Sequence, residues 1–155
     1  MLRLASLLLV EERLLEAEYF VVRLSRLRHN AFLYELNAFL PAARSVTFLL
    51  QKEFVRVPGF QPWWEARRME LARDVAAKFF LELRNFSQKQ GRVSLVGVAC
   101  GEAGRRRWTY RFAGTSERVP LELLHRDVAD CCREDLRKIA RLVLACTGAC
   151  LKFCV

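Results

Sequence analysis

The sequence predicts a mainly α-helical protein: a four-to-five-helix antiparallel bundle with a β-hairpin inserted before the last long helix. Apolar residues recur at three- and four-residue spacing along most of the chain, as they do on the buried face of a helix. Only 7 Gly and 4 Pro leave few places for the chain to turn. Between residues 92 and 113 the spacing changes to the alternation typical of strands. Short connections between the helices favour antiparallel neighbours.

The length and composition predict one folded domain over residues 1–155. A hydrophobic fraction of 53% with 28% charged residues excludes a disordered chain and is sufficient for a sizeable core. The formal net charge of +9 favours anionic partners. Nucleic acid is the commonest of these, followed by anionic membrane surfaces and acidic proteins.

Two long helices are predicted over residues 4–28 and 31–57. The second contains Pro41, which has no backbone N–H to donate, so a kink or short break is expected near residues 37–40.

The apolar first ten residues do not predict an export signal or a membrane anchor. Glu11 and Glu12 follow at once, without the small residues of a cleavage site, and the apolar run is too short to span a bilayer. We therefore expect a cytoplasmic protein that has no membrane partner and keeps its cysteines reduced.

A third helix is predicted over residues 63–89, with Pro62 at its first turn. Its apolar stripe at four-residue spacing consists of Leu71, Val75, Phe79 and Leu83. Trp63 and Trp64 are expected to fasten the preceding loop to the core, and an aromatic binding platform is the alternative.

The last long helix is predicted to follow Thr115 and Ser116, with Pro120 near its first turn. Gly148 is expected to fray or end it. Its apolar stripe consists of Leu121, Leu124, Val128, Cys132, Leu136, Ile139 and Val143.

The predicted hairpin, residues 92–113, pairs a strand at 93–98 with a strand at 108–112 through a glycine-containing turn. Its densest basic and aromatic cluster is a candidate nucleic-acid contact and consists of Arg105, Arg106, Arg107, Trp108 and Arg111. The alternative is a solvated turn whose aromatic residues are buried against the helices.

The end of the third helix carries Arg84 and Asn85, and Lys89 follows them. This segment resembles the Arg-polar-x-x-x-His motif of HEPN-domain proteins, a helical family with many RNA-cleaving toxins and defence factors. Arg84 matches the Arg of the motif, Asn85 matches its polar neighbour, and Lys89 stands at the position of the His. The resemblance covers the helical plan and three motif positions.

The resemblance implies a metal-independent ribonuclease site near a dimer interface. An Arg can stabilise the charge that develops on a phosphate, while a His can transfer the 2′-hydroxyl proton. Lys89 is a poor base at neutral pH unless burial lowers its pKa. His125 is the better of the two histidines to replace the missing base, and His29 is the other. The alternative is that Arg84 and Asn85 bind carbonyls at the helix end and that the histidines lie on the surface.

The cysteines are expected to serve in packing rather than in metal binding. Cys146, Cys150 and Cys154 recur every four residues, whereas zinc sites use Cys-x-x-Cys spacing and a fourth ligand. No metal and no cofactor is predicted.

Two hypotheses for function follow. The first is an RNA-associated toxin or defence factor that binds RNA phosphate at Arg84 and Asn85, with binding ahead of cleavage because Lys89 replaces the His. The second is a non-catalytic module that dimerises and binds other proteins. The expected partners are a second copy of the chain and either RNA or an acidic protein.

Overall fold

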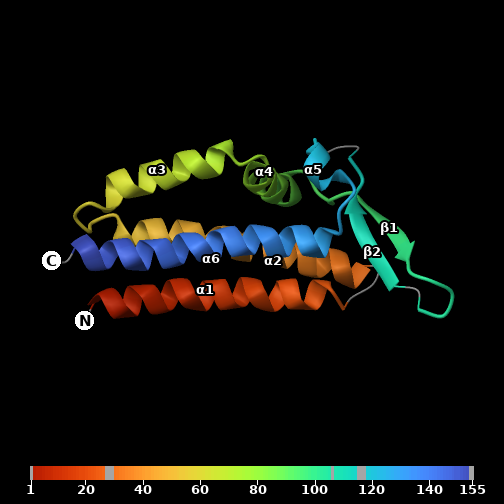
Figure 1. Cartoon of the computed structure of the whole chain (residues 1–155), viewed down its shortest axis with the longest axis horizontal. Helices are drawn as coiled ribbons and strands as arrows, with labels where there is room; N and C mark the ends of the chain where they lie inside the picture. Colours follow the sequence, from red (N-terminus) through yellow and green to blue (C-terminus); the bar gives the residue numbers. More distant parts are fainter. Residues whose placement is uncertain (1, 27–29, 106, 115–117, 154–155) are drawn as a thin grey trace.

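The computed structural model describes residues 2–26, 30–105, 107–114 and 118–153. Its elements, in chain order, are α1 (Leu2–Leu24), α2 (Asn30–Phe54), α3 (Phe60–Arg73), α4 (Val75–Lys89), β1 (Leu95–Cys100), β2 (Arg107–Phe112), α5 (Leu121–Leu124) and α6 (Val128–Phe153). The predicted class is confirmed, because the chain is mainly helical and its hairpin precedes the last long helix (Figure 1).

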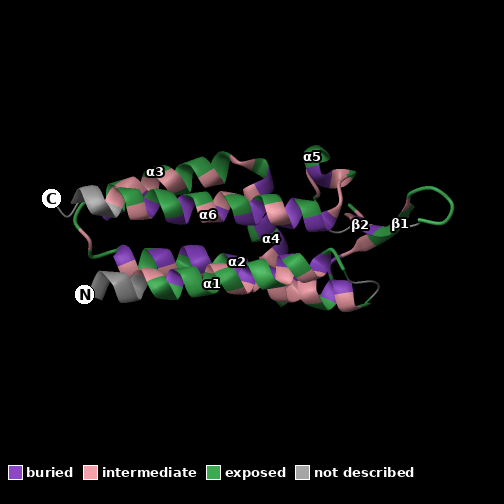
Figure 2. Ribbon diagram, turned by 60° about the horizontal axis from the view of Figure 1, so that its bottom comes forward, coloured by how far each residue is buried: buried purple, intermediate pink, exposed green. Residues whose placement is uncertain are grey.

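The long helices α1, α2 and α6 lie lengthwise beside one another (Figure 1). α1 runs antiparallel to both of the others. The hairpin and α5 lie at one end of this layer, and both chain termini lie at the other end. Buried residues follow the sides of the helices that face each other, while exposed residues cover the outer sides (Figure 2). Within the described residues, no helix is both long and apolar enough to cross a bilayer.

The predicted third helix is wrong as a single element, because Asp74 divides it into α3 and α4. The Asp74 backbone is extended, with φ −76° and ψ 110°, and its N–H donates to the carbonyls of Glu70 and Leu71 at the end of α3. Its side chain then accepts a hydrogen bond of 2.9 Å from the N–H of Ala77 in the first turn of α4. Asp74 thus ends one helix and caps the next. The turn leaves Val75, expected in the buried stripe, exposed.

Pro41 does not interrupt α2, so the break expected near residues 37–40 is absent. Phe39, Leu40, Ala42 and Ala43 are all buried on either side of it. This burial holds the segment helical despite the missing hydrogen bond, because tertiary packing outweighs the local cost of a proline.

The last predicted helix is divided near its start into a short helix, α5, and the long helix α6. α5 is a single turn that ends at His125, and α6 begins after Asp127, whose side chain accepts a hydrogen bond of 2.9 Å from the Ala129 N–H. α6 continues through Gly148 to Phe153, so the end expected at Gly148 is wrong. A helical glycine costs only about 1 kcal/mol relative to alanine, which a long packed helix tolerates. Thr115 and Ser116 lie outside the described residues.

The two strands form an antiparallel hairpin in which Leu95 pairs with Phe112 and Gly97 with Tyr110. The strands predicted at 93–98 and 108–112 are confirmed with shifts at their ends. Phe112 is buried with its ring centroid 5.0 Å from that of Phe79, and Tyr110 stacks on Phe32 at 4.3 Å. These contacts attach the hairpin to α2 and α4.

Candidate anion-binding site

Arg84 and Asn85 lie near the end of α4 and bond to each other. The Arg84 Nη1 donates a hydrogen bond of 2.9 Å to Asn85 Oδ1, and both residues are partly buried. The Arg84 Nε is enclosed by protein and has no hydrogen-bond partner among the described residues. The carbonyl of Phe86 is instead capped by the backbone N–H groups of Gln90 and Gly91. The alternative role for Arg84 was to bind carbonyl groups at the helix end. Its Nη1 donates to Asn85 instead, so that role is not observed among the described residues.

A second arginine, Arg44 of α2, lies close to Arg84. The protein around the Arg44 guanidinium, together with the positive charge of Arg84, lowers the pKa of Arg44. Arg44 remains exposed to solvent, and its Nη1 donates a hydrogen bond of 3.1 Å to Thr47 Oγ1. Among the described residues, no carboxylate pairs with Arg44 or with Arg84.

Two guanidinium groups whose charges repel each other and that have no carboxylate partner among the described residues form a site suited to an anion. Each guanidinium carries five N–H donors in a planar fork that matches a phosphate or carboxylate. Like charges disfavour each other at short range, and an anion between them removes that cost. The arrangement of Arg44, Arg84 and Asn85 can therefore bind an oxyanion.

Lys89 and His125 do not contact this site. Lys89 follows Arg84 by five residues, which places it about 140° around the helix axis, and its side chain is exposed. His125 is exposed at the end of α5. In the described part of the chain, neither makes a hydrogen bond or ion pair with Arg84 or Asn85. His29 lies outside the described residues.

Comparison with known proteins places this chain in a family. Residues 7–104 match the family model described as bacteriophage lambda protein ea47, which is more than half of the chain. The chain belongs to the ea47 family. No curated protein and no solved structure matches it. The family match includes Arg44, Arg84 and Asn85 and ends before Arg105.

The hairpin of this ea47-family chain exposes most of its predicted cluster. Arg105, Arg107 and Trp108 are exposed, and Arg111 is partly buried. Arg106 lies outside the described residues. The Trp108 ring lies against the backbone of Gly97, where an added Cβ would come within 3.3 Å of it. The aromatic residues of β2 thus differ: Phe112 is buried in the core, whereas Trp108 covers Gly97 with part of its ring and is 44% exposed.

Three cysteines of this ea47-family chain lie in the core, whereas Cys100 in β1 is partly buried, with its Sγ 3.4 Å from Thr109 Oγ1. Cys131, Cys132 and Cys146 on α6 are buried. Burial raises the pKa of the Cys131 thiol to about 11, which favours the protonated thiol over the reactive thiolate at neutral pH. No group of three His, Cys, Asp or Glu within the described residues is arranged for a metal ion. The side chains of Cys150 and Cys154 are outside that description.

Sequence reasoning missed Arg44 and Asp135. Arg44 gives no local signal, because it becomes part of a site only through a neighbour on another helix. Asp135 has a signal in its spacing: it lies three residues after Cys132 and four before Ile139, within the apolar stripe of α6. Asp135 is buried, with 8% of its surface exposed.

Proposed function

We propose that this protein is an RNA-associated factor that binds a phosphate of single-stranded RNA at Arg84 and Asn85, with Arg44 as the second cation. The observation that carries this proposal is that the charge of Arg84 is felt at Arg44, where it helps to lower the pKa, while no carboxylate neutralises either arginine within the described residues. The resemblance of the Arg84 segment to the HEPN motif and the net charge of +9 support it.

The state of Arg84 favours a role in binding over a role in stability. A buried donor left without a partner costs about 1–3 kcal/mol, and the enclosed Nε of Arg84 is such a donor. Its Nη1 is bonded to Asn85, which fixes the plane of the guanidinium. A side chain held in place at a cost, with further N–H donors available, is suited to a charged ligand.

The exposed hairpin offers a second contact for the same RNA. Arg105 and Arg107 supply charge for the phosphate backbone, and the exposed Trp108 ring supplies a surface on which a base can stack. Contacts of this kind are tolerant of sequence, so we expect RNA binding without strong sequence preference.

Cleavage is the weaker part of the proposal. A metal-independent ribonuclease needs a base beside the phosphate, and neither Lys89 nor His125 contacts Arg84 among the described residues. We therefore propose RNA binding as the activity. In a toxin or defence role, the protein would act by occupying RNA rather than by cutting it. Induced expression in a bacterial host should arrest growth for the wild type and not for Arg84→Gln.

The direct test is fluorescence anisotropy of a labelled single-stranded RNA titrated with wild type, Arg84→Gln and Arg137→Gln. Arg137 is exposed on α6 and serves as the charge-matched control. Loss of one charge-assisted hydrogen bond should weaken binding by about tenfold or more in Arg84→Gln. Equal affinities for the three proteins would overturn the proposal. In a parallel experiment the RNA is incubated with the protein in the presence of a metal chelator. Recovery of intact RNA would show binding without metal-independent cleavage.

One observation favours the second candidate, a dimerising interaction module. Leu8, Leu15 and Val22 lie seven residues apart on α1 and are exposed, Leu15 by 63% of its surface. Such spacing is typical of a helix that meets another helix along a seam. Sedimentation of wild type and Leu15→Lys checks this candidate: a dimer that Leu15→Lys dissociates supports it, and a monomeric wild type excludes it.

A further inference from the structure

A cavity of about 670 Å³ lies between α2, α3, α4 and α6. Its size falls in the range of small-molecule sites, roughly 300–1,000 Å³. Much of its wall is apolar and aromatic, formed by Phe39, Ala43, Trp64, Leu71, Phe80 and Ile139. Arg44 and Asn85 of the anion-binding site line the cavity, whereas Arg84 does not.

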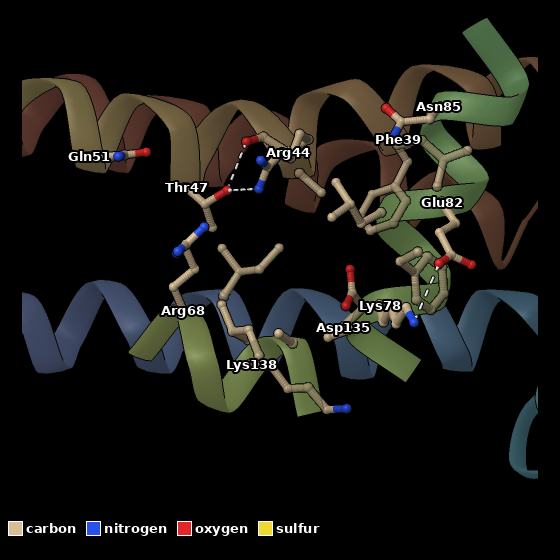
Figure 3. Close-up of a pocket in the computed structure, with 18 of the residues that line it drawn as sticks. Phe39, Arg44, Thr47, Gln51, Arg68, Lys78, Glu82, Asn85, Asp135 and Lys138 are labelled. Atoms are coloured by element: carbon tan, nitrogen blue, oxygen red, sulfur yellow. Dashed lines mark hydrogen bonds and ion pairs between the residues drawn. The ribbon is translucent and has the colours of Figure 1, made fainter. Parts of the chain in front are cut away.

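Arg44 is distinct among the cations that line the cavity. Arg68 pairs with Glu65 at 2.9 Å, and Lys78 lies 3.9 Å from Glu82. Lys138 pairs with Asp74 at 2.7 Å. Within the described residues, Arg44 alone of the cavity cations has no carboxylate partner. Figure 3 shows Arg44 and Thr47 together on α2, with Arg68 directed toward them from α3.

Asp135 supplies the polar group on the opposite side. Its carboxyl group points from α6 into the cavity toward α2 (Figure 3). It forms no hydrogen bond and no ion pair among the described residues. Burial raises the pKa of Asp135 to about 7.

We propose that this cavity binds a small amphipathic organic anion, with its anionic group on Arg44 and its apolar body against Phe39 and Phe80. The proposal goes beyond the RNA-binding function, because it concerns a small molecule and a space that Arg84 does not line.

The polar groups select this class over the alternatives. A wholly apolar ligand would enter the cavity but leave the Arg44 charge without a partner. A cation would face the charge of Arg44, which no carboxylate among the described residues neutralises, and repulsion would disfavour it. Lys78 and Lys138 already have carboxylate partners. An anion with an apolar body satisfies Arg44 and removes apolar surface from water in one step.

Ionisation of Asp135 should oppose this ligand. Below neutral pH the carboxyl group is neutral and can donate a hydrogen bond, whereas above it the carboxylate adds a negative charge inside the cavity. The affinity for the anion should therefore fall as the pH rises through about 7. Charged groups on every packed element line the cavity or act on Asp135. They are Lys138 on α6, Asp74 at the start of α4, Lys78 and Glu82 on α4, Arg44 on α2, and Arg68 with Glu65 on α3.

The probe is 8-anilinonaphthalene-1-sulfonate, a fluorescent aromatic monoanion, titrated into the folded protein. Arg44→Gln should weaken dye binding by about tenfold or more. Ala72→Trp places a ring in the cavity at an exposed position and should abolish binding. Arg137→Gln should bind the dye as the wild type does. Circular dichroism of each variant excludes unfolding as the cause.

A pH series gives a second and independent reading. Between about pH 6 and pH 8 the wild-type dissociation constant should rise by up to about tenfold, whereas Asp135→Asn should show no such rise. Competition with decanoate and with adenosine monophosphate then distinguishes an acyl anion from a heteroaromatic one. Displacement by either supports the proposal.

The proposal is overturned if dye binding survives both Arg44→Gln and Ala72→Trp, or if neither competitor displaces the dye. The variant Arg84→Gln separates a failure of the cavity proposal from a failure of the RNA proposal. That variant should lose RNA affinity and bind the dye with little change, because Arg84 does not line the cavity. Arg44→Gln should weaken the binding of both ligands, since Arg44 belongs to both sites.

Discussion

Lys138 of α6 and Asp74 form an ion pair, with Nζ and Oδ2 2.7 Å apart, where α3 ends and α4 begins. The pair ties the corner between these two helices to the longest helix of the chain. Because α4 carries Arg84 and α3 forms one wall of the cavity, this corner positions both candidate sites. Its contribution to stability can be separated into a capping part and an ionic part.

The capping part should dominate. Asp74→Ala removes the hydrogen bond to the Ala77 N–H as well as the ion pair, and should lower the free energy of unfolding by about 1–2 kcal/mol. Lys138→Gln removes only the ion pair, which is partly exposed, and should cost less than about 1 kcal/mol. Urea denaturation measures both values, with Glu16→Ala as the exposed ion-pair control. Equal losses for Asp74→Ala and Lys138→Gln would contradict the capping role.

The stability of the protein should depend on pH through Asp135. Because burial raises the pKa of Asp135 to about 7 in the folded state, the unfolded chain ionises first, and stability falls as the pH rises from about 4 to about 7. Asp135→Asn should remove this pH dependence. At about pH 8 its free energy of unfolding should exceed that of the wild type by at most ~2–4 kcal/mol. Thermal unfolding across the pH range measures the difference, and a difference that stays constant with pH would refute this assignment.

The hairpin should depend on Phe112 for its attachment. Its buried ring meets Phe79 at 5.0 Å and Phe80 at 6.2 Å between centroids, so Phe112→Ala should cost about 3–5 kcal/mol. Trp108→Ala, on the same face of the strand but exposed, should cost much less. Chemical denaturation compares the two variants, and similar losses would mean that the aromatic residues of the strand share one environment.

The two glycines Gly148 and Gly114 should respond to alanine with opposite signs. Gly148 is helical with open space around its Cβ position, so Gly148→Ala should stabilise the protein by about 0.5–1 kcal/mol. Gly114 has φ +72°, and an added Cβ there would lie 3.1 Å from Leu124, so Gly114→Ala should destabilise it. Melting temperatures of the two variants test the pair, and a shift in the same direction for both would be contrary to expectation.

Local patterns in the sequence predicted the helical class and the hairpin because each depends on neighbouring residues. Alternation and glycines near 92–113 specify a hairpin wherever it packs. The division of the third helix at Asp74 was missed because the apolar spacing from Leu71 to Val75 continues across it. The cap depends on a hydrogen bond within a turn, and Lys138 of a distant helix reinforces it.

The candidate site was predicted in part for the same reason. Arg84 and Asn85 belong to one local motif and do bond to each other. Arg44 joins them only through the packing of α2 against α4, which no local pattern encodes. Lys89 and His125 were selected by position in a motif and by residue type, and neither criterion fixes where a side chain lies in space.

The measurement that tests the central claim most directly is a double-mutant cycle on RNA affinity with Arg44→Gln, Arg84→Gln and the double variant. If both guanidinium groups bind one phosphate, removal of either should cost about tenfold or more, and the double variant should lose less than the sum of the two free-energy changes. The salt dependence of binding should also become shallower in each single variant. Strictly additive losses, or affinities unchanged from wild type, would contradict a shared anion site at Arg44 and Arg84.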